Sequence, residues 1–362
     1  MINFYEPIIS KEDILSVVKS LENKYLSGNT PVIKEFESAV SQVTGVKYVS
    51  SCSSGTAALH LSLLGLGIHK GDEVLIPSLS YIATANAVSY VGGTPIFVDI
   101  EKDSWQIDPY LIEKNITKRT KAIIPVHLYG GVPNLIEIEK IAKKYSLKII
   151  HDTAEALGSK YNGKYATGYK DVSVLSFFPN KVITTGEGGA VCTNNKKIFD
   201  LVEKLKSQGL KGKREYVHSH IGYNYRMTSM SASLGLSQIN RVDSYILKKR
   251  ELYENYKKEL QPLGFEFQKF NQQTESSFWL ISTLLPNRFP KNKFKKYLFN
   301  NNIDSRNIFV PLHLQKPYKR TNTDEFKNSI EISKRGLCLP SSPNLNINDF
   351  NYIIKTIKKF QK

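Results

Sequence analysis

The sequence predicts an α/β fold, in which a large domain with a mostly parallel β-sheet precedes a smaller α+β domain. Between about residues 45 and 195, short β-branched runs alternate with stretches of helical periodicity. Two of those runs, residues 121–126 and 147–150, are almost entirely apolar, as strands of a parallel sheet covered on both faces usually are. After about Arg241 this alternation gives way to a long charged helical stretch and to shorter strands.

The strands and helices of the large domain are expected to follow one another in turn. The apolar runs predict strands at 46–50, 73–76, 95–98, 121–126, 147–150 and 172–178. Apolar residues at helical spacing predict helices at 55–66, 81–90 and 135–145. Pro77 ends the second strand, and Gly92-Gly93 closes the helix before the third. A helix between successive strands favours a parallel sheet.

The second part of the chain is expected to hold longer helices and short strands. Helices are predicted at 243–260 and 291–299, and a last one from about Asn348, a suitable N-cap, to residue 360. A strand is predicted at 278–284. The change of pattern places a domain boundary near residue 240, so we expect domains at 1–240 and 241–362.

Composition fits a globular enzyme and argues against several other classes of protein. Of the 362 residues, 41% are hydrophobic and 23% are charged. No apolar run reaches the roughly 18 residues that a membrane-spanning helix needs, and the first residues lack the pattern of a secretory signal. Cys52, Cys192 and Cys338 show neither a disulfide framework nor metal-ligand spacing. We therefore expect a cytoplasmic protein with buried thiols, no metal and no membrane contact.

The net charge of +17 has more than one interpretation. Such an excess of positive charge is compatible with nucleic-acid binding or with attraction of an anionic substrate such as a nucleotide diphosphate. The lysines are scattered, however, and the chain shows no helix-turn-helix or zinc-finger spacing. We therefore prefer compositional drift and expect no nucleic-acid partner. A DNA-binding regulator is the alternative from another class, and a steeply salt-dependent DNA affinity would favour it.

Two segments at the ends of expected strands carry residues suited to chemistry. The segment that begins His151-Asp152 directly follows the strand at 147–150, which puts Asp152 at the carboxyl end where parallel sheets place their ligands. Lys181 follows the strand at 172–178 and precedes a glycine-rich turn, which suits a lysine that forms a Schiff base in a partly dry site. The ordinary alternatives are a helix cap for Asp152 and a solvated surface residue for Lys181.

A third segment can bind a phosphate group. Ser54, Gly55 and Thr56 lie where a strand ends and a helix begins, and the free N–H groups of a helix start attract anions. Tyr81 could offer a flat face to a ring, although a lone tyrosine is more often a core residue. A phosphate cradle, a carboxylate and a lysine are the three groups that pyridoxal 5′-phosphate (PLP) requires, so together these segments predict a PLP site.

These residues stand in segments that resemble the DegT/DnrJ/StrS family of PLP-dependent sugar aminotransferases. The resemblance covers nearly the whole chain, and its main segments are 54–59, 81–87, 126–130, 152–158, 176–181 and 222–227. It implies fold type I, the architecture of aspartate aminotransferase, with a mostly parallel seven-stranded sheet and a small C-terminal domain. It also implies PLP as the cofactor, a nucleotide-linked keto sugar and L-glutamate as substrates, and a homodimer with shared active sites.

The resemblance further assigns roles to single residues. It implies one catalytic residue, Lys181, which holds the cofactor and moves the proton. The cofactor-binding residues that it implies are Ser54, Gly55, Thr56 and Ser176 at the phosphate, Tyr81 on the ring, Asp152 at the pyridine nitrogen, Glu155 near the cofactor hydroxyl group, Asn224 from the partner subunit, and Lys181 itself. Arg226 and His313 are the candidate substrate contacts, and a carboxylate pair at the dimer interface is the alternative for Arg226.

Within the family, the chain is similar to enzymes that aminate C4 of GDP-4-keto-6-deoxymannose for polysaccharides such as O-antigen. The matching segments include 97–99, 105–108, 208–210, 221–228 and 311–315. Two departures, at 54–55 and 305–307, leave the nucleotide and the sugar stereochemistry open. Amination of a UDP- or dTDP-linked 4-keto-6-deoxy sugar is therefore an alternative, and amination at C3 is another. A sugar 3-dehydratase of the same fold has histidine where this chain has Lys181, which speaks against dehydration.

Overall fold

The large sheet holds the expected parallel strands and one strand that runs against them. In the computed structural model, which describes residues 1–211, 216–321 and 323–360, its seven strands have the order β1–β9–β8–β5–β4–β2–β3. Their bounds are β1 Tyr48–Cys52, β2 Glu73–Pro77, β3 Thr94–Val98, β4 Thr120–Ile123, β5 Lys148–Asp152, β8 Val172–Ser176 and β9 Gly189–Thr193. Neighbours pair in parallel except β9, which is antiparallel to both β1 and β8. The prediction of a mostly parallel seven-stranded α/β fold is confirmed.

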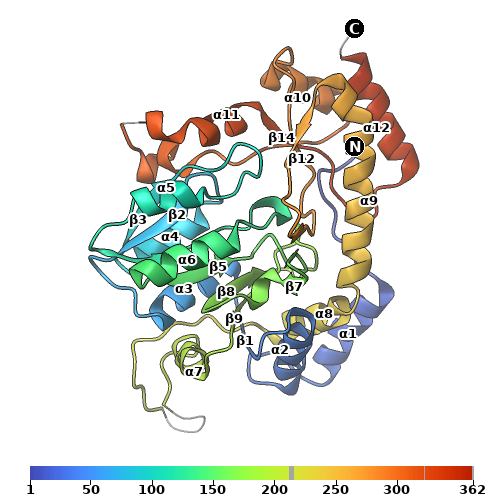
Figure 1. Cartoon of the computed structure of the whole chain (residues 1–362). Coiled ribbons are helices and arrows are strands. Elements are labelled where there is room, and N and C mark those ends of the chain that lie inside the picture. The colour runs from blue at the N-terminus through green and yellow to red at the C-terminus, as the bar shows by residue number, and fades with distance from the viewer. Residues whose placement is uncertain (212–215, 322, 361–362) are drawn as a thin grey trace.

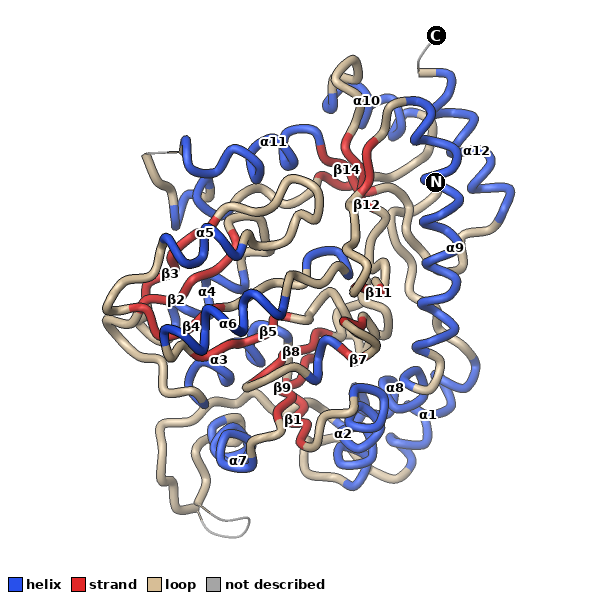
Figure 2. Tube along the Cα trace, viewed as in Figure 1, coloured by secondary structure: helices blue, strands red, loops and turns tan. Residues whose placement is uncertain are grey.

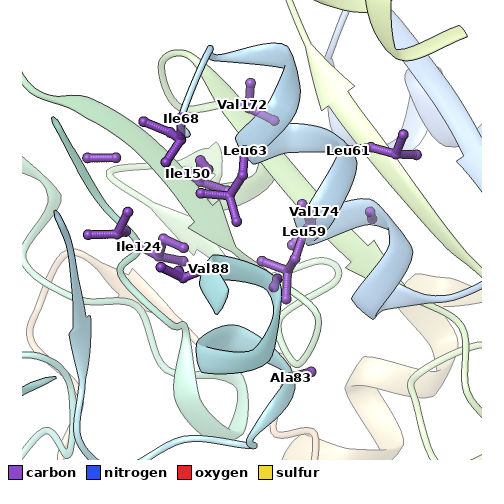
Figure 3. Close-up of a cluster of buried hydrophobic side chains, with 14 of the residues drawn as sticks. Leu59, Leu61, Leu63, Ile68, Ala83, Val88, Ile124, Ile150, Val172 and Val174 are labelled. Atoms are coloured by element: carbon purple, nitrogen blue, oxygen red, sulfur yellow. The ribbon is translucent and has the colours of Figure 1, made fainter. Parts of the chain in front are cut away.

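Helices connect these strands and cover the sheet (Figure 1, Figure 2). The helices of the first part are α1 Lys11–Glu22, α2 Pro31–Thr44, α3 Gly55–Gly65, α4 Ala83–Tyr90, α5 Pro109–Lys114, α6 Leu135–Tyr145 and α7 Lys196–Leu205. α3 is apolar on nearly every side because it is buried between the sheet and neighbouring helices. Figure 3 shows Leu59 and Leu63 of α3 in one buried cluster with Val88 of α4 and Ile150 and Val174 of the sheet.

The C-terminal part is built on a small sheet and a long helix. The helix α8 Ser229–Ile239, which packs against α1 and α2, precedes it, and its own helices are α9 Val242–Leu260, α10 Lys291–Asn300, α11 Lys327–Arg335 and α12 Ile347–Lys359. Its sheet has the order β10–β12–β14–β13, with β10 Glu266–Phe267, β12 Ser282–Leu284, β14 Gly336–Cys338 and β13 Arg306–Asn307. Figure 1 shows α9 along the right-hand side of the view, from α8 at the bottom to the small sheet near the top.

A small third sheet and several 3₁₀ helices make up the remaining short elements of the described residues. A third sheet has the order β11–β6–β7, with β6 Lys160–Tyr161, β7 Lys164–Tyr165 and β11 Thr274–Glu275. Short 3₁₀ helices are η1 Leu128–Gly130, η2 Ala166–Gly168, η3 Gln261–Leu263, η4 Leu312–Leu314, η5 Lys316–Tyr318 and η6 Asp324–Phe326. Within the described ranges, no helix is both long and apolar enough to cross a bilayer. The three cysteines are buried and unpaired, as expected.

One helix end differs from the prediction. The N-cap of α12 is Asn346, whose side-chain oxygen accepts a hydrogen bond from Asp349 N at 2.8 Å. Asn346 has extended backbone angles, whereas Asn348 lies inside the helix, so Asn348 cannot be the cap.

The division into domains at 240 and 241 stays a prediction. The change from α8 to α9 falls at this point, since α8 ends at Ile239 and α9 begins at Val242. The start of the chain nevertheless lies against the C-terminal part, because Ile2 pairs with Ile303 and its N–H donates to Asn302 O at 2.7 Å.

Candidate active site

A cavity of about 340 Å³ lies at the carboxyl ends of the parallel strands β5 and β8. Its lining includes eight of the nine residues predicted to bind the cofactor, namely Ser54, Gly55, Thr56, Tyr81, Asp152, Glu155, Ser176 and Lys181. A larger cavity of about 740 Å³ lies beside α9 and β10 and contains none of the predicted residues. We take the smaller cavity as the candidate site because it brings a lysine amine, two carboxylates and a helix start together.

The start of α3 forms one end of this cavity. Ser54 caps the helix by accepting a hydrogen bond from Ala57 N at 3.1 Å, and the N–H groups of Gly55 and Thr56 belong to the first turn, where no helical partner exists. A Cβ on Gly55 would lie 2.9 Å from the Cβ of Ser176, so only glycine lets β8 approach the helix start this closely. Free N–H groups beside a serine hydroxyl suit a phosphate group.

The antiparallel strand β9 lies between β1 and β8 and holds the start of α3 close to Ser176. Gly189 pairs with both Cys52 and Ser176, and a Cβ on Gly189 would lie 2.4 Å from Ser54 O. The glycine run that suggests a turn in the sequence is therefore partly a strand, and its lack of side chains allows close contact with the backbone before α3.

Asp152 is the last residue of β5 and is buried in the cavity wall. Its Oδ2 accepts a hydrogen bond from Thr84 Oγ1 at 2.8 Å, and its Oδ1 accepts one from Ala154 N at 3.2 Å. Burial raises the pKa of Asp152, while these hydrogen bonds and the charge of Lys181 oppose the rise. A buried carboxylate held by two donors is suited to pair with a protonated ring nitrogen.

Lys181 lies in the loop after β8 and lines the same cavity as the carboxylates of Asp152 and Glu155. Burial lowers the pKa of its amine, and the charges of Glu155 and Asp152 oppose that change. Glu155 is buried as well, and its Oε2 accepts a hydrogen bond from Tyr129 N at 2.9 Å. Burial raises the pKa of Glu155 to about 7. A lysine with a lowered pKa keeps part of its amine neutral and nucleophilic.

Tyr81 offers the cavity an exposed aromatic face. Its side chain is 58% exposed, and its ring centroid lies 5.8 Å from that of Phe309. Tyr81 is therefore not the core residue that a lone tyrosine usually is. The residues around the cavity fit PLP: a glycine-dependent phosphate cradle, a buried carboxylate, a lysine amine and a ring face are all present.

Three of the predicted residues do not line this cavity. Asn224 is exposed in its own chain, and Arg226 pairs through its backbone with Cys52. His313 is fully buried, where its Nδ1 lies 2.6 Å from Ser78 Oγ and its ring stacks on Phe326 with centroids 4.1 Å apart. The structure therefore covers His313 rather than presenting it to the cavity. The proposed roles of these residues stay predictions.

The cavity also contains residues that were given no role on the basis of the sequence. They are Thr84, Phe178, Asn180, Glu187, Trp279 and Phe309 among others. Thr84 had a signal, because it is one helical turn after Tyr81 at the start of α4. Phe309 lies between the segments 305–307 and 311–315 of the resemblance, but neither segment gave it a role. Trp279 had no signal, since it comes from the C-terminal part and is distant in sequence from every motif.

Known proteins resemble this chain over almost its full length. The DegT/DnrJ/EryC1/StrS aminotransferase family matches residues 7–358. A protein of Escherichia coli O157:H7 named GDP-perosamine synthase is 40% identical over 98% of this chain and 97% of its own. A protein of the same name from Vibrio cholerae is 36% identical over 99% of both chains. The PLP form of Spr1654 from Streptococcus pneumoniae, named as a candidate sugar aminotransferase, superimposes with a TM-score of 0.93 at 29% identity, covering 99% of this chain and 98% of that one.

Fold and cavity thus define a PLP-dependent aminotransferase of fold type I. The chain belongs to the DegT/DnrJ/EryC1/StrS aminotransferase family, as the resemblance of its motifs implied.

Proposed function

We propose that this enzyme transfers the amino group of L-glutamate to C4 of GDP-4-keto-6-deoxymannose, giving GDP-perosamine for polysaccharide biosynthesis. The observation that carries the proposal is the amine of Lys181, which shares its cavity with Asp152 and Glu155. An imidazole at this place would favour dehydration, whereas an amine suits transamination. The names of the two relatives support GDP-perosamine as the product.

PLP, when bound, supplies an aldehyde that captures an amine and a pyridinium ring that accepts electrons. The N–H groups of Gly55 and Thr56 and the hydroxyl of Ser176 bind the phosphate in this proposal, and Tyr81 covers one ring face. The Asp152 carboxylate keeps a proton on the pyridine nitrogen. The Lys181 amine would remove the proton from the Cα of glutamate and later deliver a proton to C4 of the sugar; burial lowers the pKa of this amine, which favours its action as a base.

A homodimer is part of the proposal. Ile14, Leu15 and Val18 on α1 are 41–65% exposed, and Tyr216 and Ile221 are almost fully exposed on the segment that leads to Asn224. Exposed apolar side chains of this number are typical of an interface. Asn224, exposed in its own chain, would reach the cofactor phosphate of the partner subunit.

The dimer can be tested by mixing two inactive variants. Chains with Lys181→Ala and chains with Asn224→Ala, combined at equal amounts and allowed to exchange, should recover about a quarter of the wild-type activity, because half of the dimers then contain one intact site out of two. No recovery, in a mixture from which differently tagged chains of the two variants co-purify, would place Asn224 in the site of its own chain.

Other parts of the proposal concern location and partners. We place the enzyme in the cytoplasm, because Cys52, Cys192 and Cys338 are unpaired. We also propose no nucleic-acid partner, because the positive charge is scattered along the chain.

The substrate is tested by a glutamate-dependent assay on the purified protein. GDP-, UDP- and dTDP-linked 4-keto-6-deoxyhexoses are offered side by side, and the product is identified by NMR. We expect amination at C4 of the GDP-linked sugar. A preference for a UDP- or dTDP-linked sugar would replace the proposed nucleotide, and a product aminated at C3 would replace the proposed position. Absence of amination with all three sugars would contradict the proposal.

A further inference from the structure

Trp279 contacts the lysine of the cavity in two ways. Its ring lies under the Lys181 amine, with Nζ 3.6 Å from the ring centroid. Its Nε1–H donates a hydrogen bond to the carbonyl oxygen of Asn180 at 2.6 Å. Trp279 is 3% exposed and precedes β12 of the small sheet, directly after Phe278, whose φ of 50° lies in the left-handed region. A residue of the C-terminal part therefore holds both the charged end and the backbone of the lysine segment.

A buried lysine holds Trp279 in turn. Lys249 on α9 is fully buried, and its Nζ donates to Trp279 O at 2.8 Å and to Ser341 O at 2.9 Å. Among the described residues it forms no ion pair, and burial lowers the pKa of its amine to about 7. Burying an amine without an acidic partner is costly, so the position of Lys249 calls for a structural reason. Its contact with Trp279 O supplies one.

Tyr5 completes the support from the other side. Its hydroxyl donates to the carbonyl oxygen of Lys181 at 2.7 Å, and its ring lies 4.8 Å from the Nζ of Lys249. The carbonyls of Asn180 and Lys181 are thus each held by an aromatic side chain, and both aromatic residues contact Lys249. We call Tyr5, Lys249 and Trp279 the lysine bracket.

The ring of Trp279 also affects the charge of Lys181. The face of an indole ring attracts an ammonium group, most strongly where water is excluded. Asp152 and Glu155 are the acidic groups that act on the same amine. The ring therefore adds to these two carboxylates in stabilising the protonated form against burial.

We propose that Trp279 is a positioning residue for Lys181, which directs its amine into the cavity and adjusts its proton affinity, and that Lys249 keeps Trp279 in place. This inference rests on the proposed role of Lys181 as the lysine that binds PLP. It assigns to the C-terminal part a direct influence on the reactive amine, in addition to any contact with substrate.

The test measures how fast the full-length protein, freed of its cofactor, captures PLP at a series of pH values. Capture is followed by the visible absorbance of lysine-bound PLP, and its rate rises with pH because only the neutral amine attacks the aldehyde. Trp279→Leu should move the midpoint of this rise about one pH unit lower, because the ring no longer stabilises the ammonium form. Its plateau rate should fall about tenfold, because the hydrogen bond to Asn180 is lost.

Two further variants separate the ring from the hydrogen bond. Trp279→Phe keeps an aromatic face but lacks the N–H group, so it should lower the plateau with a smaller change of midpoint. Lys249→Met should lower the plateau, since Trp279 O loses its donor. If Trp279→Leu does not fold, Trp279→Phe alone tests the role of Trp279, because phenylalanine preserves most of the buried volume.

A matched control shows whether the effect is specific. Tyr256→Phe removes a buried donor from α9, which bonds Pro340 O at 3.2 Å. This variant should capture PLP with the wild-type midpoint and plateau. A wild-type midpoint and plateau in Trp279→Phe, or the changes expected of Trp279→Leu in Tyr256→Phe, would overturn the inference.

Failure of the underlying assignment gives a different result. If Lys181→Ala still captures PLP with visible absorbance, another amine binds the cofactor and the proposed site is wrong. If Lys181→Ala loses capture while the Trp279 variants behave as wild type, the site stands and only the lysine bracket loses its role.

Discussion

The hydroxyl of Thr84 is predicted to govern how tightly the enzyme holds PLP. Its Oγ1 donates a hydrogen bond of 2.8 Å to Asp152, which is 4% exposed. Thr84→Val replaces the hydroxyl with a methyl group of similar size, so the change removes the hydrogen bond with little change in packing. A hydrogen bond to a charged group contributes about 1.5–3 kcal/mol, which corresponds to a rise of about one to two units in the pKa of Asp152.

The higher pKa of Asp152 should directly weaken the binding of PLP. The pyridine nitrogen keeps its proton only opposite an ionised carboxylate, so PLP should bind Thr84→Val about 10- to 100-fold more weakly. The dissociation constant is measured by titrating the cofactor-free protein with PLP and following its absorbance. Thr84→Ser retains the hydroxyl and should bind as the wild type does. Equal loss in the serine and valine variants, or affinity of the valine variant within a factor of two of wild type, would refute the reasoning.

Three further predictions concern the same cavity. Lys181→Ala should abolish both the visible absorbance of lysine-bound PLP and turnover, as measured by spectroscopy and a glutamate-dependent assay, and a coloured, active variant would contradict its role. Gly55→Ala should weaken PLP binding in a titration, because its Cβ would lie 2.9 Å from that of Ser176, while Gly45→Ala, at a position with nothing within 4 Å, serves as a control that tests backbone strain alone. Glu155 has a pKa of about 7 in the folded protein against 4.5 ordinarily, so its favourable contribution to stability is complete below pH 4.5 and is lost as the pH rises through 7. Glu155→Gln lacks this loss, and urea unfolding of the cofactor-free variant should show a gain over wild type of up to about 3 kcal/mol at pH 8 and little at pH 4.5; an equal difference at both pH values would rule out the titration of Glu155 as the cause.

Much of the large domain could be predicted because its strands are buried on both faces. Continuous apolar runs predicted β4 and β5. A parallel sheet brings the carboxyl ends of its strands to one edge, and for this reason Asp152 and the start of α3 line the same cavity. β9 was missed because Gly188-Gly189 has the composition of a turn. Gly189 must be a glycine because its backbone lies against Ser54. In the sequence, a glycine required for such close packing looks the same as a glycine required for a turn.

The part of the candidate site that lies within local sequence motifs could be predicted. Lys181, Asp152 and Tyr81 each follow a strand end and could be found from that position. Trp279 could not, because its partner Asn180 is 99 residues away and nothing near either residue marks the contact. His313 shows the opposite case: its motif suggested a contact with the substrate, its ring stacks on Phe326 outside the cavity lining, and its role stays a prediction.

The lysine bracket has a consequence for the order in which the protein matures. Tyr5 and Lys181 are 176 residues apart, and Trp279 lies 99 residues beyond Asn180. Contacts between such distant segments close late in folding, since the loops between them must first be ordered. During synthesis the bracket cannot form until the ribosome has released the C-terminal part. Fast capture of PLP therefore requires the chain to be folded as far as Trp279, and in refolding experiments it should lag behind the recovery of helix.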